Sequence, residues 1–200
     1  FFLFGSGYGD EDVDNTPVEE EVVKYTDKGI QFEKETIVPG SSVKGAISHR
    51  VAYHYNKEMK RWAGTEDSNL PNEAVEELFG VAGEGIPNAK AGKVYINDVF
   101  LNKEQVNNDK IFNHVAIDRF TGGALDGALF SEKVTYLKED RLEINLYLES
   151  NVDKIYQEAL KEAMKDICQG LLPLGGMTTK GHGIFTGRLL EDGKEIFNYE

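Results

Sequence analysis

Four glycines, one lysine and one histidine share a loop near the C-terminal end, Leu174-Gly175-Gly176-Met177-Thr178-Thr179-Lys180-Gly181-His182-Gly183-Ile184-Phe185. A helical pattern precedes this loop and an apolar, strand-like run follows it. Glycine lets a backbone approach a ligand closely and adopt a positive φ, and Lys180 and His182 add positive charge there. The combination suits a phosphate backbone. The alternative is a plain helix-to-strand turn with two solvated polar side chains, and the density of glycines favours binding.

Six segments carry an apolar pattern that indicates regular structure. Apolar residues recur at helical spacing in two of them and alternate with polar residues in the clearest strands. The helical stripes are Val43, Ile47, Val51 and Tyr55 in the first helix and Ile155, Ala159, Ala163, Ile167 and Leu171 in the second. In chain order they are a strand ending at Gly5, a helix after Pro39, strands over Lys93–Phe100 and Arg141–Glu149, a helix over Val152–Leu171 and a strand over Ile184–Leu190. This β-α-β-β-α-β order predicts one ferredoxin-like α+β domain over residues 1–200.

An insertion separates the first helix from the later strands. Residues 102–113 are polar and indicate a connection. His114–Phe130 alternates, breaks at Gly122-Gly123 and resumes, which predicts an extended arm or long hairpin within an insertion over about residues 102–137. Its candidate nucleic-acid contacts, by charge and stacking, are His114, Arg119, Phe120 and Thr121. The alternative is a hairpin packed on its own domain.

The first helix is preceded by a hairpin turn, Asp27-Lys28-Gly29, and begins at Pro39-Gly40-Ser41-Ser42. A serine is a good N-cap because its hydroxyl accepts from a free amide of the first turn. Free amides, the hydroxyls of Ser41 and Ser42, and Lys44 would make an anion site, to which His49 and Arg50 add charge. A capped helix that touches nothing is an equal alternative.

Composition describes an ordinary globular chain. Of the 200 residues, 40% are apolar and 28% charged, which suits one sizeable core with insertions. No apolar run approaches the ~20 residues of a membrane-spanning helix, so we expect no membrane partner. The single cysteine, Cys168, excludes an internal disulfide and fits a reducing cytoplasm. The chain opens on Phe1-Phe2-Leu3-Phe4 without a methionine, so we expect upstream residues or a fused polypeptide.

The net charge of −13 argues against indiscriminate nucleic-acid binding. The acidic residues gather in Asp10–Glu21, Glu66–Glu77 and Asp153–Asp166, whereas the candidate cations fall elsewhere. A local basic track on an acidic body therefore remains compatible with the composition.

Four segments together resemble one family, the repeat-associated mysterious proteins (RAMPs). Ile37-Val38-Pro39-Gly40-Ser41-Ser42-Val43-Lys44-Gly45-Ala46 resembles the family signature iPGSSlKGalR, and Leu78-Phe79-Gly80 is similar to its LFG. His114–Phe130 resembles its arm, I-[DK]-R-x-t-G-x-A…LF. Gly175–Gly183 resembles its glycine-rich loop. The resemblance covers nearly the whole chain in the family's order.

The resemblance implies a backbone subunit of a type III CRISPR effector complex, an antiviral assembly. Such subunits have a modified ferredoxin-like, RNA-recognition-type palm and a β-hairpin thumb. They polymerise along a CRISPR RNA with copies of themselves, related RAMP subunits and other type III subunits. The expected guide contacts are Ser41, Ser42, Lys44, His49, Arg50, His114, Arg119, Phe120, Thr121, Gly175, Gly176, Lys180, Gly181, His182 and Gly183.

The resemblance also implies cleavage of the paired target RNA by an aspartate after the first strand. Val13-Asp14-Asn15-Thr16-Pro17-Val18 resembles the family's iDnPv, so the catalytic role falls on Asp14, with Asp12 and Asp10 as alternatives. A carboxylate can hold a divalent cation or accept a proton, and Mg²⁺ suits one or two carboxylates plus phosphate oxygens. Where the family usually has an arginine, Glu19-Glu20-Glu21 stands here. The alternative is a solvated acidic loop.

Two other functions remain open. The chain could be an RNA-binding scaffold of the same fold without chemistry. It could also be a guide-processing endonuclease whose general base is His49, His54, His114 or His182. Each of those histidines sits in a segment that has another explanation, so this last function is the least favoured.

Overall fold

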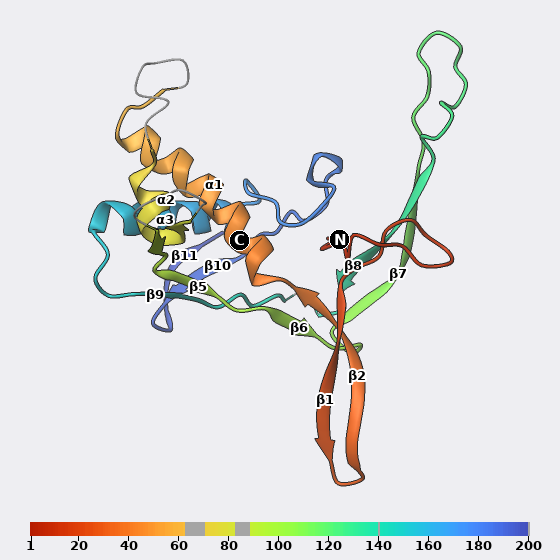
Figure 1. Cartoon of the computed structure of the whole chain (residues 1–200), viewed down its shortest axis with the longest axis horizontal. Helices are drawn as coiled ribbons and strands as arrows, with labels where there is room; N and C mark the ends of the chain where they lie inside the picture. The colour runs from red at the N-terminus through yellow and green to blue at the C-terminus, as the bar shows by residue number, and fades with distance from the viewer. Residues whose placement is uncertain (63–70, 83–88, 140, 200) are drawn as a thin grey trace. The chain divides into compact units, whose positions relative to one another are not determined.

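The computed structural model describes residues 1–62, 71–82, 89–139 and 141–199. The chain forms two compact units. The first comprises Phe1–Pro39, Asp98–Glu143 and Gly175–Gly183, and the second comprises Gly40–Asn97, Ile144–Leu174 and Ile184–Glu200. Helices and small sheets are mixed along the chain (Figure 1), which confirms the predicted combination of α and β structure.

The first unit contains a three-stranded antiparallel sheet of order β1-β2-β6. Strand β1 (Glu19–Thr26) and strand β2 (Gly29–Val38) pair along their whole length around the turn at Asp27-Lys28, which confirms the predicted hairpin. Strand β6 (Val99–Leu101) pairs only with the end of β2. The last four residues of β2 are buried and its first six are exposed, so the core lies at the root of the hairpin.

A second long hairpin completes the first unit. Strands β7 (Val106–His114) and β8 (Phe130–Leu137) pair antiparallel with a bulge between Asn107 and Lys110, and their connection extends as an arm (Figure 1). Residues 102–113, predicted as a polar connection, instead contain most of strand β7. The polar residues of this segment hid a strand because β8, distant in sequence, supplies its partner.

The second unit packs three helices with pairs of short strands. Helices α1 (Gly40–Glu58), α2 (Glu73–Phe79) and α3 (Lys154–Cys168) accompany the pairs β3 (Gly80–Val81) with β4 (Lys90–Ala91), β5 (Val94–Ile96) with β9 (Leu146–Leu148), and β10 (Arg188–Glu191) with β11 (Lys194–Asn198). The buried face of α1 is the predicted one, namely Val43, Ile47, Val51 and Tyr55. Helix α3 buries Ala159, Leu160, Ala163 and Asp166, a stripe displaced from the predicted one.

Several predicted strands are shorter than the apolar alternation suggested. The run Lys93–Phe100 divides into β5 and β6, and Arg141–Glu149 contributes only the three residues of β9. Within the described residues the largest sheet has three strands. A continuous four-stranded ferredoxin-like palm therefore stays a prediction.

The start of α1 differs in detail from the expected cap. The helix begins at Gly40, so Ser41 and Ser42 lie inside its first turn. A Cβ on Gly40 would lie 2.3 Å from the carbonyl oxygen of Ile96, which explains the glycine by close packing against β5. None of the helices in the described ranges is long and apolar enough to cross a membrane.

Candidate functional site

The first residues of β8 bring three predicted segments together within the first unit. Ser131 and Lys133 contact the acidic loop, and Glu132 contacts His114 of the arm and His182 of the glycine loop. The backbone of the acidic loop runs beside β8, because Asn15 and Glu132 form a parallel bridge. This strand is therefore the scaffold of the candidate site.

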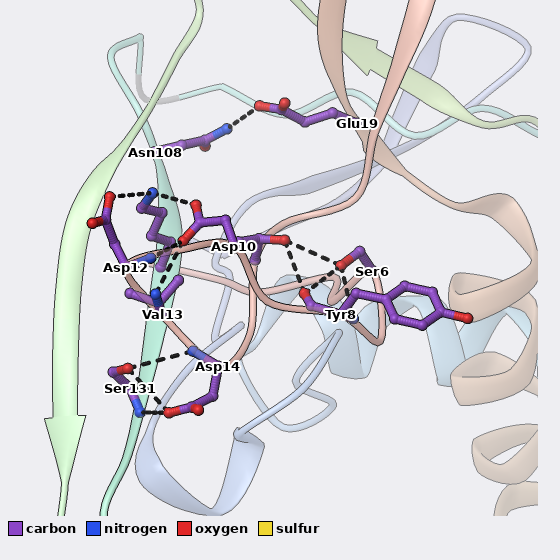
Figure 2. Close-up of polar contacts among 11 residues, drawn as sticks. Ser6, Tyr8, Asp10, Asp12, Val13, Asp14, Glu19, Asn108 and Ser131 are labelled. Atoms are coloured by element: carbon purple, nitrogen blue, oxygen red, sulfur yellow. Dashed lines mark hydrogen bonds and ion pairs between the residues drawn. The ribbon is translucent and has the colours of Figure 1, made fainter.

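The acidic loop is closed by Asp10 (Figure 2). Its Oδ1 accepts from the backbone N–H groups of Asp12 and Val13, at 2.9 and 3.0 Å. Its Oδ2 accepts from Nζ of Lys133 at 2.5 Å, and Asp12 lies 3.9 Å from the same ammonium. The hydrogen bond from Lys133 and those from the loop backbone lower the pKa of Asp10. Asp10 is thus engaged in holding the loop.

Asp14 is held in a different way. Its Oδ2 accepts from the backbone N–H and the hydroxyl of Ser131, at 2.8 and 3.1 Å (Figure 2). In return, the N–H of Asp14 donates to the Ser131 carbonyl at 3.1 Å. The side chain is exposed, and no lysine or arginine in the described part of the chain forms an ion pair with it. Asp14 is therefore a fixed, solvent-facing carboxylate at the base of the arm.

A buried polar cluster lies on the inward face of the arm root. Glu132 is fully buried, and its Oε1 accepts from Nε2 of His114 at 2.8 Å. His182 is 5% exposed, and its Nδ1 lies 3.7 Å from the same oxygen. Burial lowers the pKa of His182, although the Glu132 charge opposes this shift. His182 is therefore favoured as a neutral imidazole buried beside Glu132, where its Nδ1 has no hydrogen-bond partner among the described residues.

The glycine loop approaches its own chain closely. A Cβ on Gly175 would lie 2.5 Å from the carbonyl oxygen of Leu3, and the N–H of Gly176 donates to that oxygen at 2.7 Å. Gly183 donates to the Phe1 carbonyl at 2.9 Å. Packing on the N-terminal segment therefore accounts for much of this glycine content.

One cation of the glycine loop faces solvent. Lys180 is exposed, and its Nζ lies 4.4 Å from the centre of the Phe130 ring at the start of β8. Gly181, which follows it, has a φ of 87°, a conformation that favours glycine. The loop therefore presents Lys180 at the arm root, whereas His182 is turned inward.

The tip of the arm is ordered by Asp118. Its Oδ1 accepts from the N–H groups of Phe120 and Thr121, at 2.8 and 2.7 Å, and from the Thr121 hydroxyl at 3.0 Å. These bonds lower the pKa of Asp118. The turn leaves Arg119 exposed and Phe120 99% exposed. An aromatic ring and a guanidinium are thus carried at the end of a β-ribbon.

The remaining predicted residues belong to the second unit. Ser41, Ser42 and His49 are exposed on α1, and Lys44 is half-buried. Arg50 forms an ion pair with the buried carboxylate of Asp166, which also contacts Nε2 of His54 at 2.7 Å. The guanidinium of Arg50 also lies 4.8 Å from the centre of the Tyr53 ring.

Sequence reasoning missed the β8 residues that organise the first unit. Glu132 occupies an inward position between Phe130 and Val134 in an alternating strand, and a carboxylate at such a position was the available signal. Ser131 and Lys133 carried no comparable signal, because only the fold brings the acidic loop beside them.

The described residues contain no group of three or more histidine, cysteine, aspartate or glutamate side chains arranged to hold a metal. Two oxygens of Asp10 are already bonded, whereas Oδ1 of Asp14 accepts no hydrogen bond from the described residues. Mg²⁺ is often bound by only one or two protein carboxylates, and phosphate oxygens and waters supply its other ligands. Asp14 could be one such carboxylate. The described residues therefore fit Mg²⁺ only if RNA phosphates and waters supply most of its ligands.

Comparison with known proteins gives the family. A chain of a solved structure, "Type IV-B CRISPR Complex", is similar with a TM-score of 0.48 and 13% sequence identity, over 92% of this chain and 84% of that one. A comparison with curated proteins found no match. The RAMP superfamily model matches residues 3–186. Since this match spans most of the sequence, the chain belongs to the RAMP superfamily.

Proposed function

We propose that this chain is an RNA-binding backbone subunit of a type III CRISPR effector complex that binds guide RNA and cleaves the paired target RNA with Asp14. The observation that carries the proposal is the exposed Asp14 carboxylate, fixed by Ser131 at the base of the arm. The same strand also contacts the glycine loop. A guide-binding surface and a reactive carboxylate would then share one scaffold.

Guide binding would use the exposed Lys180, the half-buried Lys44 and the arm tip. Lys180 at the arm root and Lys44 at the start of α1 would contact phosphates, with the amides and hydroxyls of Ser41 and Ser42 beside Lys44. Phe120 and Arg119 would stack on or displace a base, since an exposed ring gains most from stacking. The overall charge of −13 restricts attraction for RNA to such local positions.

The chemistry would begin at the target's own 2′-hydroxyl. Its oxygen would form a bond to the adjacent phosphorus as the 5′-oxygen leaves and takes a proton from solvent water, and Oδ1 of Asp14 would accept the 2′ proton. The products would be a 2′,3′-cyclic phosphate and a 5′-hydroxyl. Alternatively, Asp14 and phosphate oxygens would hold Mg²⁺, which would supply charge stabilisation, and the 2′ proton would then pass to solvent water. Ser131 would keep the carboxylate oriented by bonding Oδ2 of Asp14. The other oxygen, Oδ1, would remain available to the target.

A non-catalytic scaffold subunit is the second candidate function. Glu19, Glu20 and Glu21 follow the acidic loop in place of a cation, and the carboxylates of the loop do not form a metal-holding group in the described residues. Both features would suit a subunit that binds RNA and assembles without cutting it.

One experiment separates the two functions. The full chain is assembled with guide RNA, given a labelled complementary target and Mg²⁺, and the products are mapped at single-nucleotide resolution. A cleaving subunit produces regularly spaced fragments that end in a cyclic phosphate, and chelation of the metal abolishes them. Intact target on an assembled complex would support the scaffold, and failure to bind guide RNA would refute both functions.

A further inference from the structure

The β1–β2 hairpin carries large apolar side chains on one face. Val23 is directly opposite Phe32, and Tyr25 is directly opposite Ile30. The exposed fractions are 43% and 67% for the first pair and 84% and 60% for the second. Because directly opposed residues of an antiparallel pair lie on the same face, these four side chains form one strip, here called the apolar strip.

The hairpin has little of its own to cover this strip. In the described part of the chain, β1 pairs with β2 alone, and its outer edge carries no further strand. The reverse face carries Lys24, Gln31 and Glu33. A two-stranded ribbon is only marginally stable in water unless one of its faces packs against another surface. A contiguous exposed apolar patch also marks an interaction site. The strip is therefore suited to a protein surface.

Charge makes RNA a poor occupant of the strip. Residues 19–35 contain six acidic side chains and three lysines, so the hairpin would repel phosphates. The strip is bordered on its own face by Glu21 and Lys34, which are directly opposite each other, and beyond its other end by Asp27 and Lys28 of the turn. Each end of the strip thus offers one charge of each sign.

This pattern is complementary to itself in one orientation. If two hairpins pack face to face with their tips in the same direction, β1 of each lies over β2 of the other. Val23 then meets Phe32, Tyr25 meets Ile30, and Glu21 meets Lys34. With the tips in opposite directions, Glu21 would meet Asp27 and Lys34 would meet Lys28, which places like charges together.

We propose that the apolar strip binds the same strip of a second copy of this chain, about a two-fold axis parallel to the hairpin. Such an interface is isologous, so each contact occurs twice. One hairpin face is smaller than a standard stable interface, so the dimer is weak and concentration-dependent. The proposal concerns the chain without RNA and does not depend on target cleavage.

The test measures self-association of the full chain by sedimentation, with no RNA present. The wild type is expected to dimerise at concentrations up to about 1 mM, where even a weak interface associates. Phe32→Ser is expected to weaken dimerisation by at least about tenfold, since it removes the largest wholly apolar side chain of the strip twice per dimer. Glu33→Lys, on the reverse face, is the matched control and should leave the dimer unchanged.

The charge pair tests the orientation. Glu21→Lys and Lys34→Glu should each weaken the dimer several-fold, and the double variant E21K/K34E should restore it, because the pair is recreated with its signs exchanged. Circular dichroism of each variant verifies the fold. A monomeric wild type, loss of the dimer in the Glu33→Lys control, or a tighter dimer in Glu21→Lys would overturn the proposal, even if the hairpin then proved to bind another protein.

Discussion

Gly9→Ala should move the candidate catalytic aspartate without changing any charge. A Cβ at residue 9 would lie 2.1 Å from the carbonyl oxygen of Val13 and 2.9 Å from Cα of Asp14. Ordinary contact begins at 3.4 Å, so residue 9 and the backbone at Val13–Asp14 must move apart by about 1.3 Å, and we expect Asp14 to take part in that movement. A hydrogen bond of 2.8 Å from Ser131 to Asp14 does not survive a displacement of that size.

Two magnitudes follow from this shift. Loss of the bonds between Asp14 and Ser131 should raise amide exchange at Asp14 and Asn15 by about tenfold, since one net hydrogen bond contributes about 0.5–1.5 kcal/mol. If Asp14 is catalytic, target cleavage should fall by about 100-fold, the cost of a misplacement of about 1 Å. RNA binding should be unchanged.

The assay is amide exchange by NMR, followed by cleavage at matched RNA loading. Gly187→Ala is the control, because nothing lies within 4 Å of a Cβ there and its φ needs no glycine. Unchanged exchange at Asp14 and Asn15 in a folded Gly9→Ala variant would refute the packing argument. Normal cleavage by a variant with a displaced loop would refute the need for a fixed carboxylate.

Three further results are expected. Lys44→Ala combined with Lys180→Ala should weaken RNA binding for all sequences and lower the salt slope by ~0.7 for each phosphate that is no longer neutralised; an unchanged slope would show that neither lysine touches the backbone. Because burial lowers the pKa of His182 below its ordinary 6.5, the unfolded chain binds more protons below pH 6.5, so this residue's contribution to stability is lost as the pH falls from 6.5 through the folded pKa. Urea unfolding across this range should therefore be less pH-dependent in His182→Leu, and an identical dependence would contradict the assignment. Hydrogen exchange over residues 114–130 should slow when RNA is loaded, since the described hydrogen bonds of residues 115–129 are few and stay within the arm, and strong protection in the free chain would contradict this.

Sequence patterns were most informative where interactions within one segment determine its structure. The face of α1 from Val43 to Tyr55 and the turn at Asp27-Lys28 were predicted correctly, because helical spacing and turn chemistry are local. Strand β7 was missed, because its stability depends on β8, which follows only after the long arm. Such pairing leaves little trace in a polar segment.

The candidate site shows the same limit. The glycine loop was expected to approach a ligand, which stays a prediction, whereas Gly175 approaches Leu3 of its own chain. His182 was expected to face a ligand, and the structure buries it beside Glu132. Contacts with distant segments decide which side chains of a loop face solvent. The order of residues within the loop does not show which of them will be buried.

Catalysis by Asp14 is tested most directly by comparing Asp14→Asn with Asp10→Asn and Asp12→Asn in one assembled complex. Asparagine keeps an oxygen that can accept from Ser131, so the loop should stay in place while the charge is lost. If Asp14 is the catalytic group, guide and target binding persist in all three variants and cleavage is abolished only in Asp14→Asn. Cleavage at the wild-type rate by Asp14→Asn, with matched RNA loading, would contradict that role.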